Sequence, residues 1–562
     1  MANLRPILWV GLAFLAYLLW VEWQKDYGAK PAPQPATTVA SESAPVPEVS
    51  MAANTASQPS GDLPEQLSPL EEPTHAAAET KTPEAHNTVT VVTDVLTLEI
   101  DPVGATVVSA RLNDYPVALE NPQDTVRLFT PSGPDFYIAQ SGLLSRQPAP
   151  NHTSEYQSAR PEYRLGEGAD TLEVPFTWSG PDGVQVTKTF VLHRGSYVIQ
   201  VRTELGNNGE QAWTGALYAQ LQRAVHEQTK GNRYNNPSRY SFNGIGFYSP
   251  EEKLEKVKYK NVAEEPYQRT DSGGWLAMIQ HYFFAAWIPP ADESVTYTTQ
   301  VYAPAGRPQY IARGVAPQVR VEPGESHAFD MRLYVGPKLQ DTLDKIAPGL
   351  DLTVNYGIFT VISAPLFWLL EHIHGVVGNW GWAIVLLTVL VKLAFFKLTE
   401  AQYRSMARMR KLQPRIEKLR ERYGDDRQRM SQAMMELYRE ERVNPLGGCL
   451  PIVVQIPVFI ALYWVLLESV ELRQAPFILW INNLSVRDPY FILPALNATF
   501  MIATQRLTPT VGMDPLQRRI MQAMPVVFAV MFAFFPAGLV LYWATNAGLS
   551  LAQQWYITRR NN

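Results

Sequence analysis

One basic residue, Lys392, lies inside a long apolar run of this sequence and is the strongest candidate for chemistry. If the run is helical, the Cα of Lys392 lies about 7 Å deeper than that of Lys397, at 1.5 Å of rise per residue. An ammonium group inside a membrane is costly unless it is paired, hydrated or able to reach the interface. Lys392 alone leaves two interpretations open, a functional charge and a lysine that merely extends to the surface.

Polar residues within the same and neighbouring apolar runs favour the functional interpretation. Thr388 lies one helical turn before Lys392, and Tyr542, Thr545 and Asn546 share one helix face at spacings of three and four. Individually, such residues commonly hydrogen-bond one membrane helix to another. Together they predict a hydrated groove for a substrate, lined by Lys392, Thr388, Gln455, Asn497, Tyr542, Trp543, Thr545 and Asn546.

No carboxylate accompanies Lys392 within these runs. The nearest acidic residues all fall at or beyond the outer ends of the runs, namely Glu371, Glu468, Glu471 and Asp488. Transporters of ions or protons usually carry acidic or histidine relays at mid-depth. The sequence therefore disfavours a secondary transporter, for which a repeat of the spans is also expected and is not visible.

Motifs for catalysis, nucleotide binding and metal binding are not found in the sequence. Cys449 is the only cysteine, which rules out an intrachain disulfide and a cysteine-based metal cluster. His193, His226 and His281 lack the spacing of metal ligands. A second alternative, a membrane-anchored periplasmic carbohydrate-active protein, needs paired catalytic carboxylates or histidines, and none can be assigned. We predict no enzyme activity, no catalytic residue, no metal and no cofactor.

The charges of the chain divide it into two parts that face different surroundings. Residues 1–350 carry 27 basic and 39 acidic side chains, net −12, whereas residues 351–562 carry 21 and 14, net +7. An acidic globular surface mainly maintains solubility, and basic residues between apolar runs are typical of the cytoplasmic edge of a membrane. The two parts are therefore predicted to lie on opposite sides of a bilayer.

The N-terminal region predicts an anchor and a tether. Residues 6–21 are apolar and uncharged, and they end in Trp20-Val-Glu-Trp23 rather than at small residues typical of a cleavage site, so residues 1–23 are interpreted as an uncleaved transmembrane anchor. Residues 24–87, with ten prolines between Pro31 and Pro83, show no apolar period. This composition predicts a disordered tether.

From Thr88 the pattern changes to alternating polar and apolar residues, as in Val184-Gln-Val-Thr-Lys-Thr-Phe-Val191. Turn residues separate many such stretches up to about Val335. This pattern predicts one large β sandwich, placed at residues 88–345.

Beyond Leu350 the apolar runs lengthen enough to cross a bilayer. The final run, 520–558, is about twice the ~20 residues that one crossing needs, so it must fold back, and Phe535-Pro-Ala-Gly538 is the predicted turn. Together with the anchor, six crossings are predicted, near 4–23, 378–399, 446–467 and 489–506, with two in 520–558.

The run Leu352–Leu370 is ambiguous, and the distribution of basic residues decides its place. Residues 400–442 hold twelve Lys and Arg residues, which belong in the cytoplasm. If residues 352–370 also crossed the bilayer, those twelve charges would lie outside. Residues 351–375 are therefore predicted to form an interfacial periplasmic helix, with both chain termini in the cytoplasm.

The basic segment at residues 400–443 is predicted to form a cytoplasmic helical hairpin. Met409, Leu412, Ile416 and Leu419 follow helical spacing, and Gly424-Asp-Asp426 supplies a stop and a cap before the pattern resumes. A solvated arm without a partner is one interpretation, and a docking arm for a ribosome or lipid headgroups is the other. The docking candidates are Arg404, Arg408, Arg410, Lys411, Arg415 and Lys418.

Several stretches resemble the YidC family of membrane protein insertases in sequence, order and spacing. They are Ala401-Gln-Tyr-Arg-Ser-Met-Ala-Arg-Met-Arg-Lys-Leu-Gln-Pro414, Asn444-Pro-Leu-Gly-Gly-Cys449, Val470-Glu-Leu-Arg-Gln-Ala-Pro-Phe477 and Phe535-Pro-Ala-Gly-Leu-Val-Leu-Tyr542. The resemblance covers the whole chain in the form found in Gram-negative bacteria. It implies a five-helix core made by the spans after the first, 446–562 supplying the last four and a short tail, and a periplasmic supersandwich similar to sugar-mutarotase folds.

The same resemblance implies a groove that is open to the cytoplasm and to lipid. It also implies that the protein inserts its substrates either alone or together with the Sec translocon. The family's groove cation is usually arginine, and the matching residue here is Lys392, which keeps the charge and lacks the planar fork of arginine. The expected partners are nascent membrane proteins, the Sec translocon, membrane lipids and, through the hairpin, the ribosome, without sequence-specific nucleic acid binding. The expected location is the bacterial inner membrane.

Overall fold

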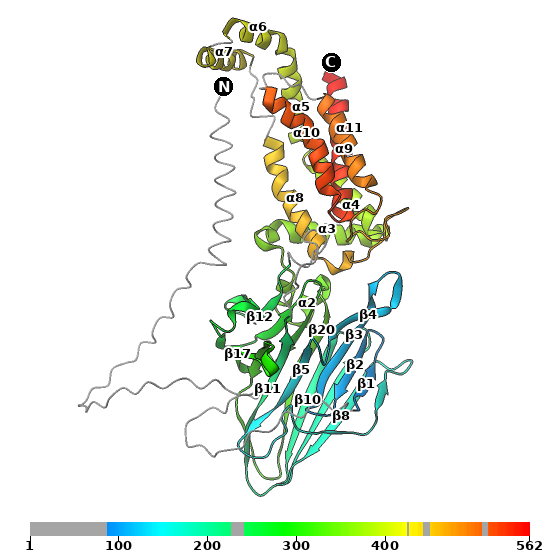
Figure 1. The fold of residues 1–562 in the computed structure, drawn as a ribbon. Coiled ribbons are helices and arrows are strands. Elements are labelled where there is room, and N and C mark those ends of the chain that lie inside the picture. Colours follow the sequence, from blue (N-terminus) through cyan, green and yellow to red (C-terminus); the bar gives the residue numbers. More distant parts are fainter. Residues whose placement is uncertain (1–86, 226–240, 424–425, 442–449, 508–514, 562) are drawn as a thin grey trace, which may run out of the picture.

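The computed structural model describes residues 87–225, 241–423, 426–441, 450–507 and 515–561. These residues form a β domain followed by a bundle of helices (Figure 1). The predicted anchor and tether, residues 1–86 of the chain, lie outside the described residues.

The β domain consists of two sheets of mostly antiparallel strands. The first sheet has eleven strands: β14 (Gln268–Ser272), β17 (Ser294–Tyr302), β18 (Gln309–Val315), β11 (Trp213–Ala224), β5 (Tyr137–Ser145), β3 (Thr106–Ala118), β2 (Leu96–Asp101), β1 (Val89–Val92) and β7 (Glu162–Arg164) in spatial order, with β19 (Val319–Val321) on β11 and β4 (Asn121–Phe129) on β3. The second has nine: β13 (Lys253–Val257), β12 (Gly244–Ser249), β15 (Trp275–Ile279), β16 (Phe283–Ile288), β20 (Ser326–Pro337), β10 (Val198–Asn207), β9 (Val184–His193), β8 (Thr171–Ser179) and β6 (Gln157–Ser158).

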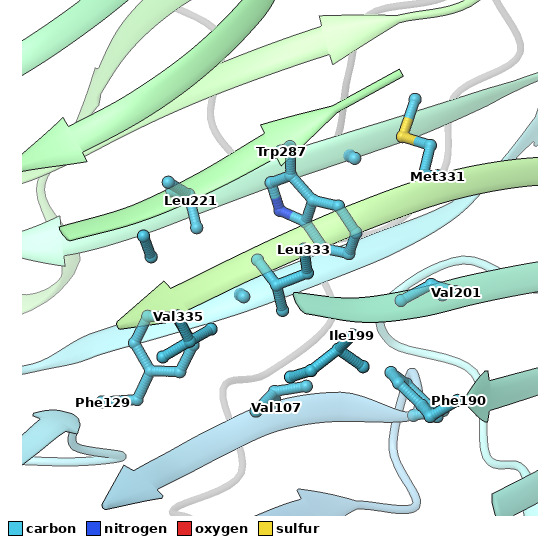
Figure 2. Close-up of a cluster of buried hydrophobic side chains, with 14 of the residues drawn as sticks. Val107, Phe129, Phe190, Ile199, Val201, Leu221, Trp287, Met331, Leu333 and Val335 are labelled. Carbon is cyan, nitrogen blue, oxygen red and sulfur yellow. The ribbon is translucent and has the colours of Figure 1, made fainter. Parts of the chain in front are cut away.

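Alternation along the strands produces the core between these sheets. In β9, for example, every second residue from Val184 to Leu192 is buried, as a pleated strand with one face on the core requires. Side chains from both sheets meet in this layer, among them Val107 and Phe129 from the first sheet and Trp287 and Leu333 from the second (Figure 2). The predicted β sandwich is therefore confirmed.

The helices that follow the sheets are of two kinds, either largely apolar or rich in charged residues. They are α2 (Gln340–Ile346), α3 (Thr360–Val377), α4 (Trp380–Ala394), α5 (Phe396–Lys411), α6 (Gln413–Tyr423), α7 (Arg427–Glu440), α8 (Leu450–Glu468), α9 (Ile492–Leu507), α10 (Pro515–Phe532) and α11 (Ala537–Asn561), with short 3₁₀ turns at Leu350–Thr353, Gly357–Phe359 and Val470–Leu472. Helices α3, α4 and α8 are largely apolar, whereas α5, α6 and α7 carry many charged residues. The fold-back predicted at Phe535-Pro-Ala-Gly538 is confirmed, since α10 ends at Phe532 and α11 begins at Ala537.

Helix α3 lies crosswise at the end of the bundle nearest the β domain, whereas α8 and α11 run lengthwise (Figure 1). By length and composition, Gly357–Val377 is the one stretch among the described residues that is long and apolar enough to span a membrane, and Trp380–Ala394, Gln455–Glu468 and Arg519–Phe532 are shorter apolar helices. Several large apolar side chains of α3 are exposed, including Val361 and Trp368. The crosswise course agrees with an interfacial helix, although the helix begins nine residues later than the predicted segment.

The boundary between the second predicted span and the basic hairpin differs from the expectation. Helix α4 ends at Ala394, and α5 begins at Phe396 after a short break rather than at residue 400. The hairpin itself consists of α6 and α7, which pack through Leu412, Ile416, Met434 and Leu437. The Asp426 carboxylate accepts hydrogen bonds from the backbone N–H groups of Gln428 and Arg429, so Asp426 caps α7 as predicted.

The β domain packs against the helical bundle through one continuous cluster of buried apolar residues. Tyr248 and Trp275 of the second sheet belong to the same cluster as Leu350 and Leu462 of the helical part. Gly349 has a φ of 71°, and a Cβ atom there would lie 2.1 Å from the Tyr248 ring. Only glycine fits both this left-handed conformation and this close approach.

Candidate functional site

Lys392 is buried, with 8% of its surface exposed, and its side chain reaches from α4 to α11. Its ammonium group donates a 2.8 Å hydrogen bond to the Ser550 hydroxyl on α11. That hydroxyl in turn donates to the Asn546 carbonyl oxygen at 2.7 Å. Lys392 therefore belongs to a polar contact between α4 and α11, and the interpretation of a lysine reaching the membrane surface does not fit this geometry.

Other candidates lie buried on the helices around this contact. Thr388 donates its hydroxyl hydrogen to the Ile384 carbonyl oxygen within α4. Asn497 on α9 and Tyr542 and Asn546 on α11 each have a buried side-chain oxygen without a hydrogen-bond partner among the described residues. A buried polar atom without a partner costs free energy. Their oxygens can therefore accept hydrogen bonds from water or from a polar ligand.

The remaining candidates are less closely associated with Lys392. Gln455 on α8 lies near the Tyr542 hydroxyl, without a hydrogen bond of ordinary geometry. Thr545 on α11 is half-buried. The Trp543 ring lies 4.5 Å from that of Phe459 and 5.1 Å from that of Phe532, within an aromatic cluster of α8, α10 and α11. Its indole nitrogen, like the oxygens of Asn497, Tyr542 and Asn546, is buried without a hydrogen-bond partner among the described residues.

Two residues at the site were not predicted from the sequence. Ser550 follows Asn546 by four residues, so extending the polar face of Tyr542 by one more turn would have identified it. Tyr403 on α5 donates its hydroxyl hydrogen to the Ser550 carbonyl oxygen at 3.3 Å. No local pattern relates Tyr403 to α11, because their proximity depends on how α5 packs after the break at Phe395.

The basic docking candidates fall on two different helices. Arg404, Arg408, Arg410 and Lys411 belong to α5, and Arg415 and Lys418 belong to α6. Arg404 pairs with Glu400 at 2.6 Å, and Arg415 pairs with Glu441 at 2.6 Å, which joins α6 to the end of α7. Arg408, Lys411 and Lys418 are exposed. All six residues thus lie within the predicted segment 400–443, four on α5 and two on α6.

Within the β domain, the buried cation Lys188 has a structural role. Its ammonium group donates to the Gly104 and Ser141 carbonyl oxygens at 2.8 and 2.9 Å, and it lies 5.1 Å from the centre of the Tyr156 ring. Burial lowers the pKa of Lys188 to about 7. Since both hydrogen bonds go to the backbone, this lysine ties strands together. Among the described residues, no group of His, Cys, Asp and Glu side chains is arranged to hold a metal ion.

The periplasmic end of the bundle and the β domain share polar contacts. Ser241 donates to a Glu468 carboxylate oxygen at 3.0 Å, and Arg473 donates to the Pro116 carbonyl oxygen at 2.8 Å. The ring Nε2 of His281 lies 2.9 Å from the Leu467 carbonyl oxygen, and burial lowers the pKa of His281 to about 4, so the ring is neutral and donates. The two parts are therefore joined by polar as well as apolar contacts.

A β-sandwich domain joined to an apolar helical core with a buried cation defines a membrane-embedded protein with a large domain outside the membrane. Residues 88–369 match the family model described as the YidC periplasmic domain, and residues 372–562 match the 60Kd inner membrane protein model. The chain belongs to the YidC family of membrane protein insertases. It is accordingly an inner-membrane protein with a periplasmic domain, and its function is not enzymatic.

Relatives over the full length carry the same name. The membrane protein insertase YidC of Methylococcus capsulatus is 48% identical over 561 residues, covering 100% of this chain and 98% of the relative. That of Thioalkalivibrio sulfidiphilus is 47% identical over 573 residues, with 100% and 98% covered. Among solved structures, an active YidC insertase with its first transmembrane domain resolved is 20% identical, covers 84% of this chain and 93% of that one, and gives a TM-score of 0.40. A galactose mutarotase related enzyme from Lactobacillus acidophilus covers 44% of this chain and 97% of that one at 7% identity, with a TM-score of 0.28.

Proposed function

We propose that this protein inserts other proteins into the inner membrane by receiving their polar segments at the buried site around Lys392. A nascent segment with a short extracytoplasmic tail, often acidic, enters among the polar residues of α4, α9 and α11. The Lys392 charge and the neighbouring oxygens lower the cost of dehydrating that tail. The apolar part of the client then moves sideways into lipid.

The observation that carries this proposal is the buried ammonium group of Lys392, which is hydrogen-bonded to Ser550, on helices that also carry buried side-chain oxygens without a partner in the described part of the chain. A charge at the centre of a bilayer costs about 2.5–3.5 kcal/mol on insertion scales. A site that keeps the client's charged tail hydrated over half of its path across the bilayer removes much of that free-energy cost. No carboxylate forms an ion pair with Lys392 among the described residues, so its charge is available to an acidic client.

The proposed arrangement has six spans, with 1–23 as an anchor, residues 351–375 at the periplasmic interface and both termini in the cytoplasm. The crosswise course of α3 and the exposed lysines of α5 and α6 support it. The β domain is proposed to be a supersandwich. The Sec translocon and, through the basic helices, the ribosome and lipids are the proposed partners.

Replacement of Lys392 by Glu tests the proposal. Insertion of a client with an acidic tail is followed in cells depleted of the native protein, and we expect it to fall at least several-fold. Lys392→Arg is the matched control, because it retains the positive charge and should retain insertion. Undiminished insertion by Lys392→Glu would refute the role of this charge.

A further inference from the structure

We infer that Asp488 is the positioning residue that closes the periplasmic end of the insertion site. It does so by locking the loop of residues 469–491, here called the outer loop, onto the helices that carry the site. The inference rests on the proposed function, since it concerns access to the same site. It assigns a role to an acidic residue that lies at the end of a span and takes no part in binding clients.

Asp488 is an almost completely buried carboxylate, 1% exposed, and its hydrogen bonds join two separate segments. One oxygen, Oδ1, accepts from the indole Nε1 of Trp480 at 3.0 Å and from the backbone N–H of Tyr490 at 3.1 Å. The other, Oδ2, accepts from the backbone N–H of Leu493 at 2.7 Å. Hydrogen bonds to an ionised group are stronger than those between neutral groups, and a helix N-terminus favours a negative charge.

The contact with Leu493 connects Asp488 to the candidate site. Leu493 lies in the first turn of α9, and Asn497 is one turn further along on the same face. Both residues are buried. Asp488 therefore sets where α9 begins and, through that start, where the Asn497 amide lies.

The segment just before Asp488 is joined to α11 by backbone hydrogen bonds. The N–H of Ala537 donates to the Val486 carbonyl oxygen at 2.7 Å, and the N–H of Gly538 donates to the Leu484 carbonyl oxygen at 2.9 Å. Arg487 and Pro536 form an antiparallel bridge at the same place. This short pairing fixes the outer loop to the first turn of the helix that carries Tyr542 and Asn546.

The front half of the outer loop is tied to the start of α4. The Asn379 side chain donates to the carbonyl oxygens of Pro476 and Phe477 at 3.3 and 3.2 Å. Ile481 and Leu484 are buried in the same apolar cluster as residues of α4, α8, α9 and α11. The outer loop thus packs with α4, α8, α9 and α11, and the hydrogen bond between Trp480 and Asp488 joins its front half to its end.

Sided chemical labelling tests this inference without any client. Cys449 is replaced by Ser, Asn497 by Cys, and the protein in intact cells is treated from the periplasmic side with a membrane-impermeant maleimide. With Asp488 present we expect slow labelling from that side. Asp488→Ala should raise the rate at least about tenfold, which corresponds to about 1.4 kcal/mol of closure free energy. Asp488→Asn should give an intermediate rate because its amide oxygen replaces only part of the carboxylate.

Arg487→Ala is the matched control, since the Arg487 side chain is exposed and its contact with Pro536 is made by the backbone. Its labelling rate should equal that of the parent. Labelling from the cytoplasmic side in inverted vesicles separates the inference from general destabilisation, which would raise the rates on both sides together.

Where Asp488→Ala fails to accumulate, Trp480→Phe provides the second variant, because it removes one donor and leaves both backbone hydrogen bonds. Unchanged periplasmic labelling in the folded variants would overturn the role of Asp488. That outcome is distinguishable from failure of the proposed function, which is measured by client insertion with Lys392→Glu and requires no labelling.

Discussion

The ammonium group of Lys392 and the hydroxyl of Ser550, 158 residues apart in the chain, form a 2.8 Å hydrogen bond that joins α4 to α11. If the positive charge is what a client recognises, removing Ser550 should matter less than removing the charge. Ser550→Ala is expected to reduce insertion of an acidic-tailed client by about tenfold at most, because a hydrogen bond contributes about 0.5–1.5 kcal/mol and the charge remains. Lys392→Met, which keeps the length of the side chain, should reduce it much further. Equal losses in a cell-based insertion assay would contradict this ranking.

The contact between Gly381 and Phe477 makes a prediction about stability. A Cβ atom at Gly381 would lie 2.0 Å from the Phe477 ring, so Gly381→Ala forces the ring to move. Such overpacking costs about 1–3 kcal/mol, and the thermal midpoint in detergent should fall by several degrees. Phe477→Ala removes the obstacle, so the double variant should lose less than the sum of the two single variants. If the stability losses of the two single variants added up to that of the double variant, the close contact between Gly381 and Phe477 would not be the cause of the destabilisation.

Glu471 predicts a pH dependence of stability. Burial, followed by the nearby Glu371 and Asp341 charges, raises the pKa of Glu471 from 4.5 to about 7. The folded protein therefore holds a proton that the unfolded chain releases, so this stabilisation is complete below about pH 4.5 and is lost as the pH rises through about 7. Between pH 5 and 8, we expect Glu471→Gln to show a smaller decrease in thermal midpoint than the parent. If the thermal midpoints of Glu471→Gln and of the parent fell in parallel with pH, the raised pKa of Glu471 would be contradicted.

The exposed lysines near the basic hairpin predict an electrostatic contribution to membrane or ribosome contact. Lys411→Glu combined with Lys418→Glu should weaken cosedimentation of the detergent-solubilised protein with anionic vesicles about tenfold or more at low salt, at ~1 kcal/mol for each basic residue. The effect should shrink as salt screens the charges. Lys411→Arg with Lys418→Arg is the control and should bind normally. Loss of binding in that control would indicate damage to the helices instead.

Removal of the strands of the β domain separates insertion from a carbohydrate-active function. A variant lacking residues 88–337 retains α2, whose Gln340 accepts a 2.7 Å hydrogen bond from Tyr356. It should accumulate to a lower level, because residues that pack on the second sheet, such as Leu350, become exposed. Insertion per molecule should be largely retained. If a folded, membrane-embedded variant lost insertion completely, the proposal that the helical core inserts clients without the β domain would be contradicted.

Local pattern determined the main elements of this protein. Alternation such as that of Val184 to Leu192 predicts a strand because successive side chains point to opposite faces. The turn at Phe535-Pro-Ala-Gly538 follows from a run too long for one crossing and from Pro and Gly at its centre. Lys392 could also be singled out as a candidate from the sequence, since a charge in an apolar run is costly wherever the helix packs.

Tertiary structure decided which residues share a site. Trp543 follows Tyr542 by a step of about 100° around the helix, and only the packing of α8, α10 and α11 brings its ring against those of Phe459 and Phe532. Ser550 and Tyr403 reach Lys392 or its partner only through the packing of α4, α5 and α11. The sequence places Asp488 only at or beyond the outer end of an apolar run, and the folded outer loop buries it between Trp480 and Leu493. Periodicity specifies the direction of a side chain around its own helix, whereas its neighbours depend on contacts between segments far apart in the chain.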